Sequence, residues 1–339
     1  MFIQAAALLF GLVLILIAAE FFTNGIEAFG RHFSFSQAVV GSIFAAVGTA
    51  LPETILPVVA IFLSGGESAK EIGVGAILGA PFMLATLAFF LMGVTISVSA
   101  MLKRRPFTLN VEVLSVRRDI VFFLVMYSAA IVLPQVAGHA SQAPIAVLLV
   151  IGYLFYAWMT FRGESAEMEE SEHMYLWKII RKIRGAAVAE HPSLSVIVLQ
   201  VIVSLGVMVE GAHTFVKSLE YISHRFGMDP MLFALLLAPV ATELPEKFNS
   251  VTWTWKGRDT LAMGNITGAM VFQATFPVSV GLLYTDWKLT GMALFSAALA
   301  MASTLIVMGS ILLWKRVHPV AMLMGGGLYL VYAAVLILR

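Results

Sequence analysis

Two six-residue segments of this 339-residue chain end in the same Leu-Pro-Glu sequence, and each lies inside an apolar stretch. They read Gly48-Thr49-Ala50-Leu51-Pro52-Glu53 and Ala241-Thr242-Glu243-Leu244-Pro245-Glu246. A carboxylate in a membrane is costly, and a proline within a helix removes a backbone hydrogen bond. Because both features occur in corresponding halves of the chain, the motifs predict a binding site at the interface of two repeats.

Composition indicates a polytopic α-helical membrane protein. Hydrophobic residues make up 60% of the chain and charged residues 12%, and the mean hydropathy is +0.92, well above that of soluble domains. Apolar stretches of about 20 residues or more, each long enough to cross a membrane, recur along the chain. We expect an all-α fold of ten transmembrane helices, near 3–23, 37–63, 72–102, 120–161 (two crossings with a turn at 134–141), 194–217, 231–255, 260–285, 289–314 and 317–338.

The basic residues predict which side of the membrane each loop faces. Of the 21 Lys and Arg residues, fifteen fall in inside loops if the N-terminus is outside, five fall in outside loops, and Lys247 lies within a helix. Cytoplasmic loops are enriched in Lys and Arg, so both termini should face outward. The N-terminal apolar run lacks a basic flank and is expected to be an uncleaved first helix. The chain has no cysteine, which excludes disulfides and thiolate metal sites and fits a bacterial inner membrane.

A shift of 193 residues superposes the two halves of the sequence. It places Glu20 on His213, Glu27 on Glu220, Thr49 on Thr242 and Glu53 on Glu246, and after a four-residue gap Gly75 and Gly79 fall on Gly264 and Gly268. Each half then holds five helices, and an odd number per half forces opposite orientations, so we expect an inverted repeat. The expected units are 1–161 and 194–339. The polar cytoplasmic connector at 162–193 is either an amphipathic surface segment or a cation-sensing element.

The two motifs offer oxygen ligands. Pro52 and Pro245 cannot donate to the carbonyl four residues before them, and Pro57 and Pro239 predict further helix breaks. Free carbonyls, threonine hydroxyls and carboxylates suit protons and hard cations such as calcium or sodium. We therefore expect small inorganic cations and membrane lipid as partners, no nucleic acid, no cofactor beyond the transported cation, and a monomer or weak homo-oligomer.

The duplicated motifs resemble the α-repeats of the sodium/calcium exchanger superfamily of calcium/cation antiporters. In that family two inverted copies of Gly-Thr-Ser-Leu-Pro-Glu are each followed by a helix with a Gly-Asn-x-x-Gly pattern. The corresponding segments here are Gly75-Ala76-Ile77-Leu78-Gly79 and Gly264-Asn265-Ile266-Thr267-Gly268. The resemblance implies ten helices in two inverted halves and exchange of calcium for sodium or protons by alternating access. It also implies that Glu53 and Glu246 are the main cation ligands, with Thr49 and Thr242 as neighbours; the full set of candidate ligands is Glu53, Glu246, Thr49, Thr242, Glu243, Asn265 and Gln273.

Several family positions differ in this chain. In the first half the serine becomes Ala50, the asparagine becomes Ala76 and the closing asparagine becomes Leu84. In the second half Glu243 replaces the serine and Gln273 replaces the closing residue. The chain has fewer neutral oxygen ligands and more titratable groups than the family pattern, so protons are expected as the coupling ion rather than sodium.

Glu243 and Lys247 are additions to the family pattern. They stand four positions apart on one expected helix, so an ion pair is the favoured interpretation. Two alternatives remain open: the Lys247 ammonium lies where a cation lies in relatives, or Glu243 carries a proton. Asn249 and Ser250, one turn further on, either line the same path or pack in the core.

Other functions remain as alternatives to antiport. A cation-binding sensor or scaffold that has lost transport would explain the missing ligands of the first half. A membrane-embedded hydrolase would use Glu53 and Glu246 as an acid/base pair, but the chain has no cysteine and no His-Glu-x-x-His or Gly-x-Ser-x-Gly motif. Glu20, Glu210 and His213 are further ionisable residues in or near expected spans, either functional or exposed to water at helix ends.

Overall fold

The computed structural model describes residues 1–33, 45–163, 174–177, 182, 192–289 and 291–338. Across these ranges the chain is helical and contains no strand. The elements are α1 (Phe2–His32), α3 (Ala45–Phe62), α4 (Glu67–Met83), the π-helical turn η2 (Leu84–Ala88), α5 (Phe89–Met101), α6 (Val113–Ala137), the 3₁₀ turn η3 (His139–Ser141), α7 (Gln142–Gly163), α9 (Leu194–Phe226), α10 (Pro230–Thr242), α11 (Leu244–Trp255), α12 (Asp259–Gln273), α13 (Phe276–Tyr284), α14 (Gly291–Trp314) and α15 (Pro319–Ile337).

The chain is an integral membrane protein. Eight helical segments within the described ranges are long and apolar enough to cross a membrane. Large apolar side chains point outward from them; Leu154 is 62% exposed and Leu330 68% exposed, as lipid-facing positions should be. Two shorter apolar helices, Glu53–Phe62 and Pro230–Val240, belong to the expected crossings that carry the motifs. Residues 37–44 of the first of these crossings lie outside the described residues, and the count of ten helices stays a prediction.

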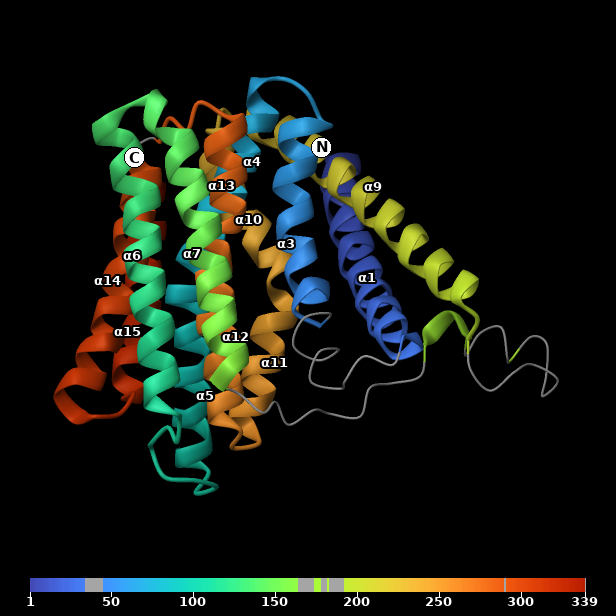
Figure 1. Ribbon diagram of the computed structural model, residues 1–339. Helices are drawn as coiled ribbons and strands as arrows, with labels where there is room; N and C mark the ends of the chain where they lie inside the picture. The colour runs from blue at the N-terminus through green and yellow to red at the C-terminus, as the bar shows by residue number, and fades with distance from the viewer. Residues whose placement is uncertain (34–44, 164–173, 178–181, 183–191, 290, 339) are drawn as a thin grey trace.

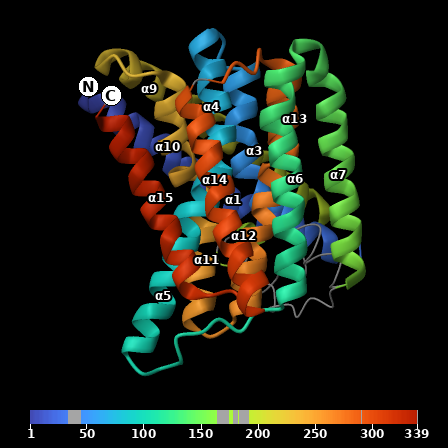
Figure 2. The same cartoon turned by 90° about the vertical axis from the view of Figure 1, so that its left-hand side faces the viewer.

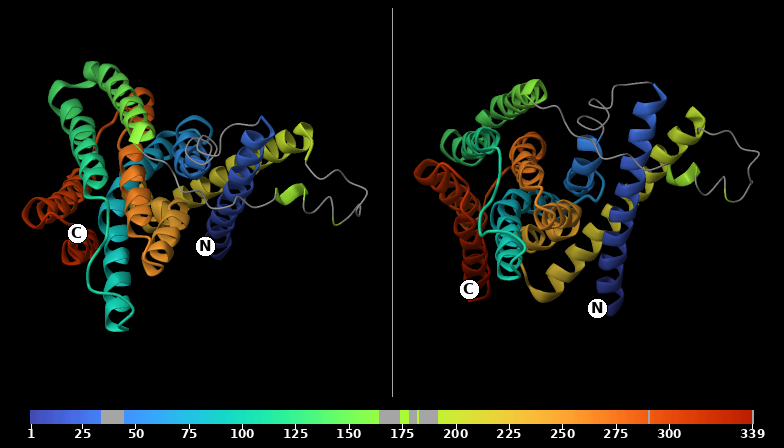
Figure 3. Two further views of the ribbon diagram at one scale, coloured as in Figure 1. Left: turned by 60° about the horizontal axis from the view of Figure 1, so that its bottom comes forward. Right: turned by 90° about the horizontal axis from the view of Figure 1, so that it is seen from below.

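The helices form a bundle with the motif-bearing segments near its centre (Figure 1). Helices α1 and α9 lean together at one edge, while α6, α7, α14 and α15 lie at the other (Figures 1 and 3). The largest hydrophobic core joins α4, α5, α6, α12, α14 and α15, with buried rings such as Phe82, Tyr127 and Tyr332. Both chain ends lie at the same end of the bundle (Figures 1 and 2), as an even number of crossings requires.

The first helices of the two halves pack against each other in opposite directions. A Cβ added at Gly11 would lie 2.7 Å from the carbonyl oxygen of Gly211, and further along α1, Gly25 faces Gln200. As residue numbers rise along α1, those of the contacting residues fall along α9, so the two helices are antiparallel. Because the two backbones nearly touch at Gly11 and Gly211, only glycine fits there.

The two motif segments also run in opposite directions. Gly75 and Gly79 of α4 pack against the carbonyl oxygens of Met231 and Leu235, so α4 and α10 are parallel. Helix α3 precedes α4 through a tight turn and packs against it, which makes α3 antiparallel to α4 and hence to α10 (Figure 1). Opposite directions of the first helices and of the motif segments are what an inverted repeat requires.

The equivalent glycines of the second half are not packed in this way. No heavy atom lies within 4 Å of a Cβ added at Gly264, and at Gly268 the nearest is the Tyr156 hydroxyl at 3.7 Å. Small residues at this spacing allow close helix approach, and such an approach is present at α4 and not at α12. Two halves with matching sequence motifs adopt different packing in this conformation.

This difference predicts different effects of alanine. In Gly79→Ala the new methyl group would lie 2.1 Å from the carbonyl oxygen of Leu235, which is backbone and cannot turn aside. We expect a loss of about 1–3 kcal/mol from overpacking. Gly264→Ala is the matched control, and it should keep or slightly raise stability because alanine favours a helix. Thermal denaturation of both variants measures the difference, and equal melting temperatures would contradict the close α4–α10 packing.

Local signals explain several helix boundaries. The Asp229 side chain accepts a hydrogen bond from Leu232 N at 3.1 Å and Pro230 follows at the first helical position, so α10 begins there. The turn predicted at 134–141 is confirmed, with α6 ending at Ala137 and Gly138 at φ +75°. The expected breaks at Pro57 and Pro239 are wrong, because both prolines lie within helices that remain continuous.

Helix α10 ends instead at Thr242, and Glu243 separates it from α11. The prediction that Glu243 and Lys247 share one regular helix is therefore wrong. Lys247 N still donates to Glu243 O at 3.1 Å, so the spacing of one helical turn between the two side chains is kept.

Candidate functional site

Three buried carboxylates come from the two motif segments. Glu53 lies on α3, Glu243 at the junction of α10 and α11, and Glu246 in the first turn of α11; all are at most 6% exposed. Each has one oxygen without a hydrogen-bond partner in the described structure, namely Glu53 Oε1, Glu243 Oε1 and Glu246 Oε2. Buried polar atoms are normally paired, so three open carboxylate oxygens mark a region that can accept protons or a cation.

Helix α12 contacts both motif segments. The Gln273 side-chain amide donates to Glu53 Oε2. The Asn265 side-chain amide donates to Glu246 O at 3.3 Å and to Ser250 Oγ at 3.1 Å. The two amides stand eight residues apart on the helix, or about 12 Å along its axis. One helix therefore joins residues from the first and second halves of the chain.

Glu243 and Lys247 form the ion pair favoured by their spacing. Lys247 Nζ lies 2.8 Å from Glu243 Oε2 and also donates to Pro239 O at 3.3 Å. The lysine is 5% exposed and the glutamate fully buried. A buried pair with short contacts is strongly coupled, because removal of one partner leaves an uncompensated charge.

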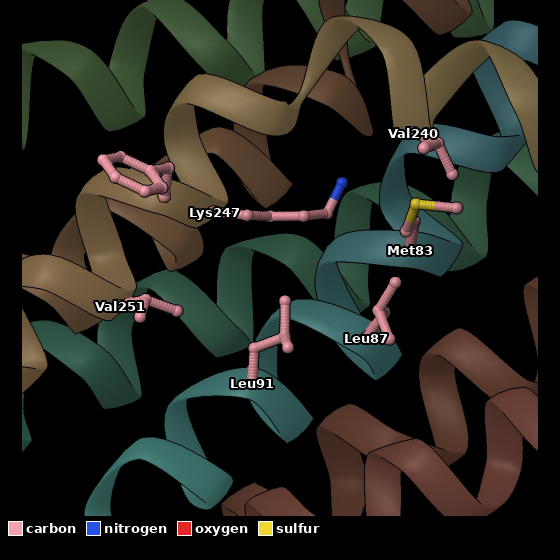
Figure 4. Close-up of a pocket in the computed structure, with 7 residues that line it drawn as sticks. Met83, Leu87, Leu91, Val240, Lys247 and Val251 are labelled. Carbon is pink, nitrogen blue, oxygen red and sulfur yellow. The ribbon is translucent and has the colours of Figure 1, made fainter.

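A lateral cavity of about 220 Å³ lies beside the lysine (Figure 4). Its lining comes from α4, η2 and α5 on one side and from α10 and α11 on the other. The lining residues are Met83, Leu87, Leu91, Val240, Lys247, Phe248 and Val251. All of them except Lys247 are apolar, and Phe248 is 71% exposed, so the cavity faces hydrocarbon rather than water.

The other predicted ligands occupy different surroundings. Thr242 is buried and its hydroxyl donates to Ala238 O at 3.2 Å. Thr49 lies on α3, but its side chain is outside the described residues. The Asn249 side chain is exposed, whereas Ser250 is buried and its hydroxyl accepts a hydrogen bond from the Asn265 amide. Among the side chains that the structure describes, no group of three or more His, Asp or Glu is arranged to hold a metal ion. The candidate ligands are thus close to the motifs but not assembled into a cage.

The remaining ionisable candidates lie along α1 and α9. Glu20 is exposed and accepts a hydrogen bond from the Tyr175 hydroxyl at 2.8 Å, and Glu210 is also exposed. His213 Nδ1 lies 3.2 Å from Ser64 Oγ. Glu20 and His213, which the sequence places near the ends of expected spans, lie inside helices of 31 and 33 residues. Glu210 also lies inside the second of these helices.

Only a short piece of the polar connector falls within the described residues. There, Tyr175 N donates to Asn24 Oδ1 at 2.8 Å and Leu176 N to Gln200 Oε1 at 3.0 Å. Because Asn24 belongs to α1 and Gln200 to α9, this piece is attached to both helices.

A buried acidic residue outside the two motifs was missed by the reading of the sequence. Asp119 on α6 is 3% exposed; it accepts from Thr267 Oγ1 at 2.7 Å and from Arg118 Nη2 at 3.0 Å. Since Thr267 is on α12, this contact ties that helix to α6. In the sequence Asp119 follows two arginines and immediately precedes the charge-free stretch 120–161, and an acid at the start of an expected span was the available signal.

A second acid–base contact fixes the start of α12. Arg105 binds both carboxylate oxygens of Asp259, and Nη1 lies 2.8 Å from Oδ1. Arg105 also donates to Thr254 O at 2.9 Å. Helix α12, which carries Asn265 and Gln273, is therefore held at its N-terminal end by Arg105 and further along by the contact of Thr267 with α6.

The chain is similar to known membrane proteins in sequence and in fold. The chain is 24% identical to the inner membrane protein YrbG of Escherichia coli over 99% of its own length and 97% of that protein. Its fold is similar to that of the H⁺/Ca²⁺ exchanger CAX, with a TM-score of 0.69 and 19% identity over 98% of this chain and 82% of that one. It is also similar to the sodium-calcium exchanger NCX_Mj, with a TM-score of 0.54 and 20% identity over 98% and 97% of the two chains. The model of the family described as sodium/calcium exchanger protein matches residues 3–162 and 196–339, so the chain belongs to that family.

Proposed function

We propose that this protein is a secondary cation antiporter that exchanges calcium or another cation for protons by alternating access. One observation carries the proposal: in this exchanger-family chain the two Leu-Pro-Glu segments run antiparallel, and α12 donates hydrogen bonds to both. Gln273 donates to the Glu53 carboxylate, and Asn265 donates to the main-chain oxygen of Glu246. Glu53 and Glu246 are the proposed cation ligands, with Thr49, Thr242, Asn265, Gln273 and Glu243 as neighbours. The unequal packing of the two glycine motifs supports a cycle in which the halves exchange conformations.

Proton coupling follows from the ligand set. The site region holds three buried carboxylates, and the amides of Asn265 and Gln273 already bond to motif residues. Carboxylates that bind either a proton or a cation couple the two fluxes, whereas sodium selection needs additional neutral oxygens.

The expected result is calcium uptake driven by a pH gradient. Proteoliposomes holding the purified protein should accumulate radiolabelled calcium when an outward proton concentration gradient is imposed, and uptake should stop when an ionophore removes the gradient. An outward sodium gradient at constant pH should drive little uptake. Sodium-driven uptake that ignores pH would contradict proton coupling, and failure of every tested divalent cation would contradict antiport.

We also propose two five-helix repeats, 1–161 and 194–339, with both termini outside and the 162–193 connector in the cytoplasm. The fifteen-to-five distribution of basic residues and the antiparallel α1 and α9 support this topology. Single cysteines at Lys256 and Lys288, both exposed, lie on loops at opposite ends of the α12–α13 segment. In intact cells an impermeant thiol reagent should label Lys288→Cys and spare Lys256→Cys; the reverse pattern would invert the topology.

A cation sensor without transport is the second candidate. It is favoured by the resident Lys247–Glu243 pair and by ligands that are not assembled in this conformation. A sensor would gain thermal stability from the cation and show no flux in the proteoliposome assay, so the same preparation separates the two functions.

A further inference from the structure

The Lys247 ammonium is held by the kinds of oxygen that hold metal cations. Its hydrogen bonds go to a carboxylate oxygen of Glu243 at 2.8 Å and to the carbonyl oxygen of Pro239 at 3.3 Å. Carboxylate and carbonyl oxygens are the ligands preferred by hard cations. The group that fills this position is therefore itself a cation, supplied by the chain.

Among the side chains that the structure describes, those that line the cavity beside Lys247 offer its ammonium no polar partner. The lysine methylenes border the lateral cavity, whose other lining side chains are all apolar (Figure 4). The ammonium is directed away from the facing residues Leu87 and Leu91, toward the α10–α11 junction (Figure 4). The apolar wall covers the stem of the side chain and keeps its charge beside Glu243.

Glu243 has binding capacity that the lysine does not use. The glutamate is fully buried, and its Oε1 has no hydrogen-bond partner in the described structure. An ionised carboxylate accepts at both oxygens, so one oxygen remains open next to the paired one. Because Glu243 Oε1 is buried and has no hydrogen-bond partner in the described structure, the carboxylate can bind more than the lysine ammonium.

We infer that Lys247 is a tethered cation, which occupies a monovalent cation position of the proposed transport site. The inference rests on the proposed exchange function. The ammonium bears one positive charge and is balanced by one carboxylate, so the ion that it replaces is a monovalent hard cation such as sodium. Glu53 and Glu246 are then left for the exchanged cation, and the protein operates without a mobile ion at Glu243.

Removal of the ammonium should therefore create a sodium site. Lys247→Gln leaves the Glu243 carboxylate without a counter-charge. A bound sodium ion should supply that positive charge. We expect its melting temperature to rise by about 3–6 °C at a sodium concentration ten times the dissociation constant, relative to choline chloride at equal ionic strength. The wild type and Lys247→Arg, which keep the charge, should show no such rise. The double variant Glu243→Gln with Lys247→Gln lacks the carboxylate and should not respond either.

Each result of this comparison decides the inference. A sodium response confined to Lys247→Gln supports it, as does recovery of that variant only from sodium buffers. No response, or failure to recover it in either salt, overturns it, because sodium has then not replaced the ammonium. A sodium response in Lys247→Arg also overturns it. The readout is binding rather than flux: wild-type transport with no sodium response contradicts only the tethered cation, whereas a sodium response without wild-type transport contradicts only the antiport function.

Discussion

Glu53→Gln and Glu246→Gln should each abolish cation exchange while the protein still folds. Glutamine keeps the size of the side chain and removes its charge. Two unit charges about 4 Å apart attract by about 4 kcal/mol at an effective dielectric constant of 20, which corresponds to roughly a thousandfold in affinity. Both residues are buried, and each has one oxygen without a hydrogen-bond partner in the described structure, so the lost charge lies at an atom that is open to a cation.

The control for this experiment is a glutamate in a membrane-spanning helix that faces outward. Glu210 on α9 is exposed, and Glu210→Gln should transport at the wild-type rate. Initial rates of calcium uptake in proteoliposomes, normalised to correctly folded protein by gel filtration, measure the difference. Normal exchange by both motif variants would place the cation site elsewhere in the chain.

The pair of Glu243 and Lys247 should show strong coupling in stability. Glu243→Ser alone leaves a buried ammonium, and Lys247→Ala alone leaves a buried carboxylate. Each single change should lower the free energy of unfolding by about 3–5 kcal/mol in sodium-free buffer. The double variant removes both charges and should be more stable than either single variant, because no unpaired charge remains.

A double-mutant cycle of thermal or denaturant unfolding measures that coupling. The 2.8 Å contact between Nζ and Oε2, with both groups buried, predicts that the two losses do not add. Losses that simply sum would rule out an energetic pair. Transport by the double variant gives separate information: a folded double variant with altered coupling would show that Glu243 carries a proton or binds the cation.

Much of the architecture was predictable from the sequence because it depends on local properties. Hydropathy identified the long spans, and the turn at 134–141 followed from its proline and glycine. The spacing of Glu243 and Lys247 predicted their contact, since one helical turn brings such side chains together wherever the helix lies. The repeat of Leu-Pro-Glu likewise selected Glu53 and Glu246, both of which are buried.

Proline positions were a poorer guide to helix breaks. Pro57 and Pro239 lie within continuous helices, and the break falls at Glu243. A membrane protein tolerates proline in a helix because neighbouring groups satisfy the freed carbonyl. Lys247 Nζ adds a second donor at Pro239 O, which already accepts from Glu243 N, and no local rule could have located this contact.

The membrane class, the family and the acidic residues of the candidate site could be predicted from the sequence, because apolar length, motif spacing and charge within an apolar stretch are properties of the chain. The tertiary fold sets which polar groups meet. Gln273 reaches Glu53 across 220 positions, and Thr267 reaches Asp119 across 148. It also decided that Gly79 is packed against α10 while Gly268 is open. These differences arise from how whole helices approach one another, and two segments with the same local pattern can pack differently in a given conformation.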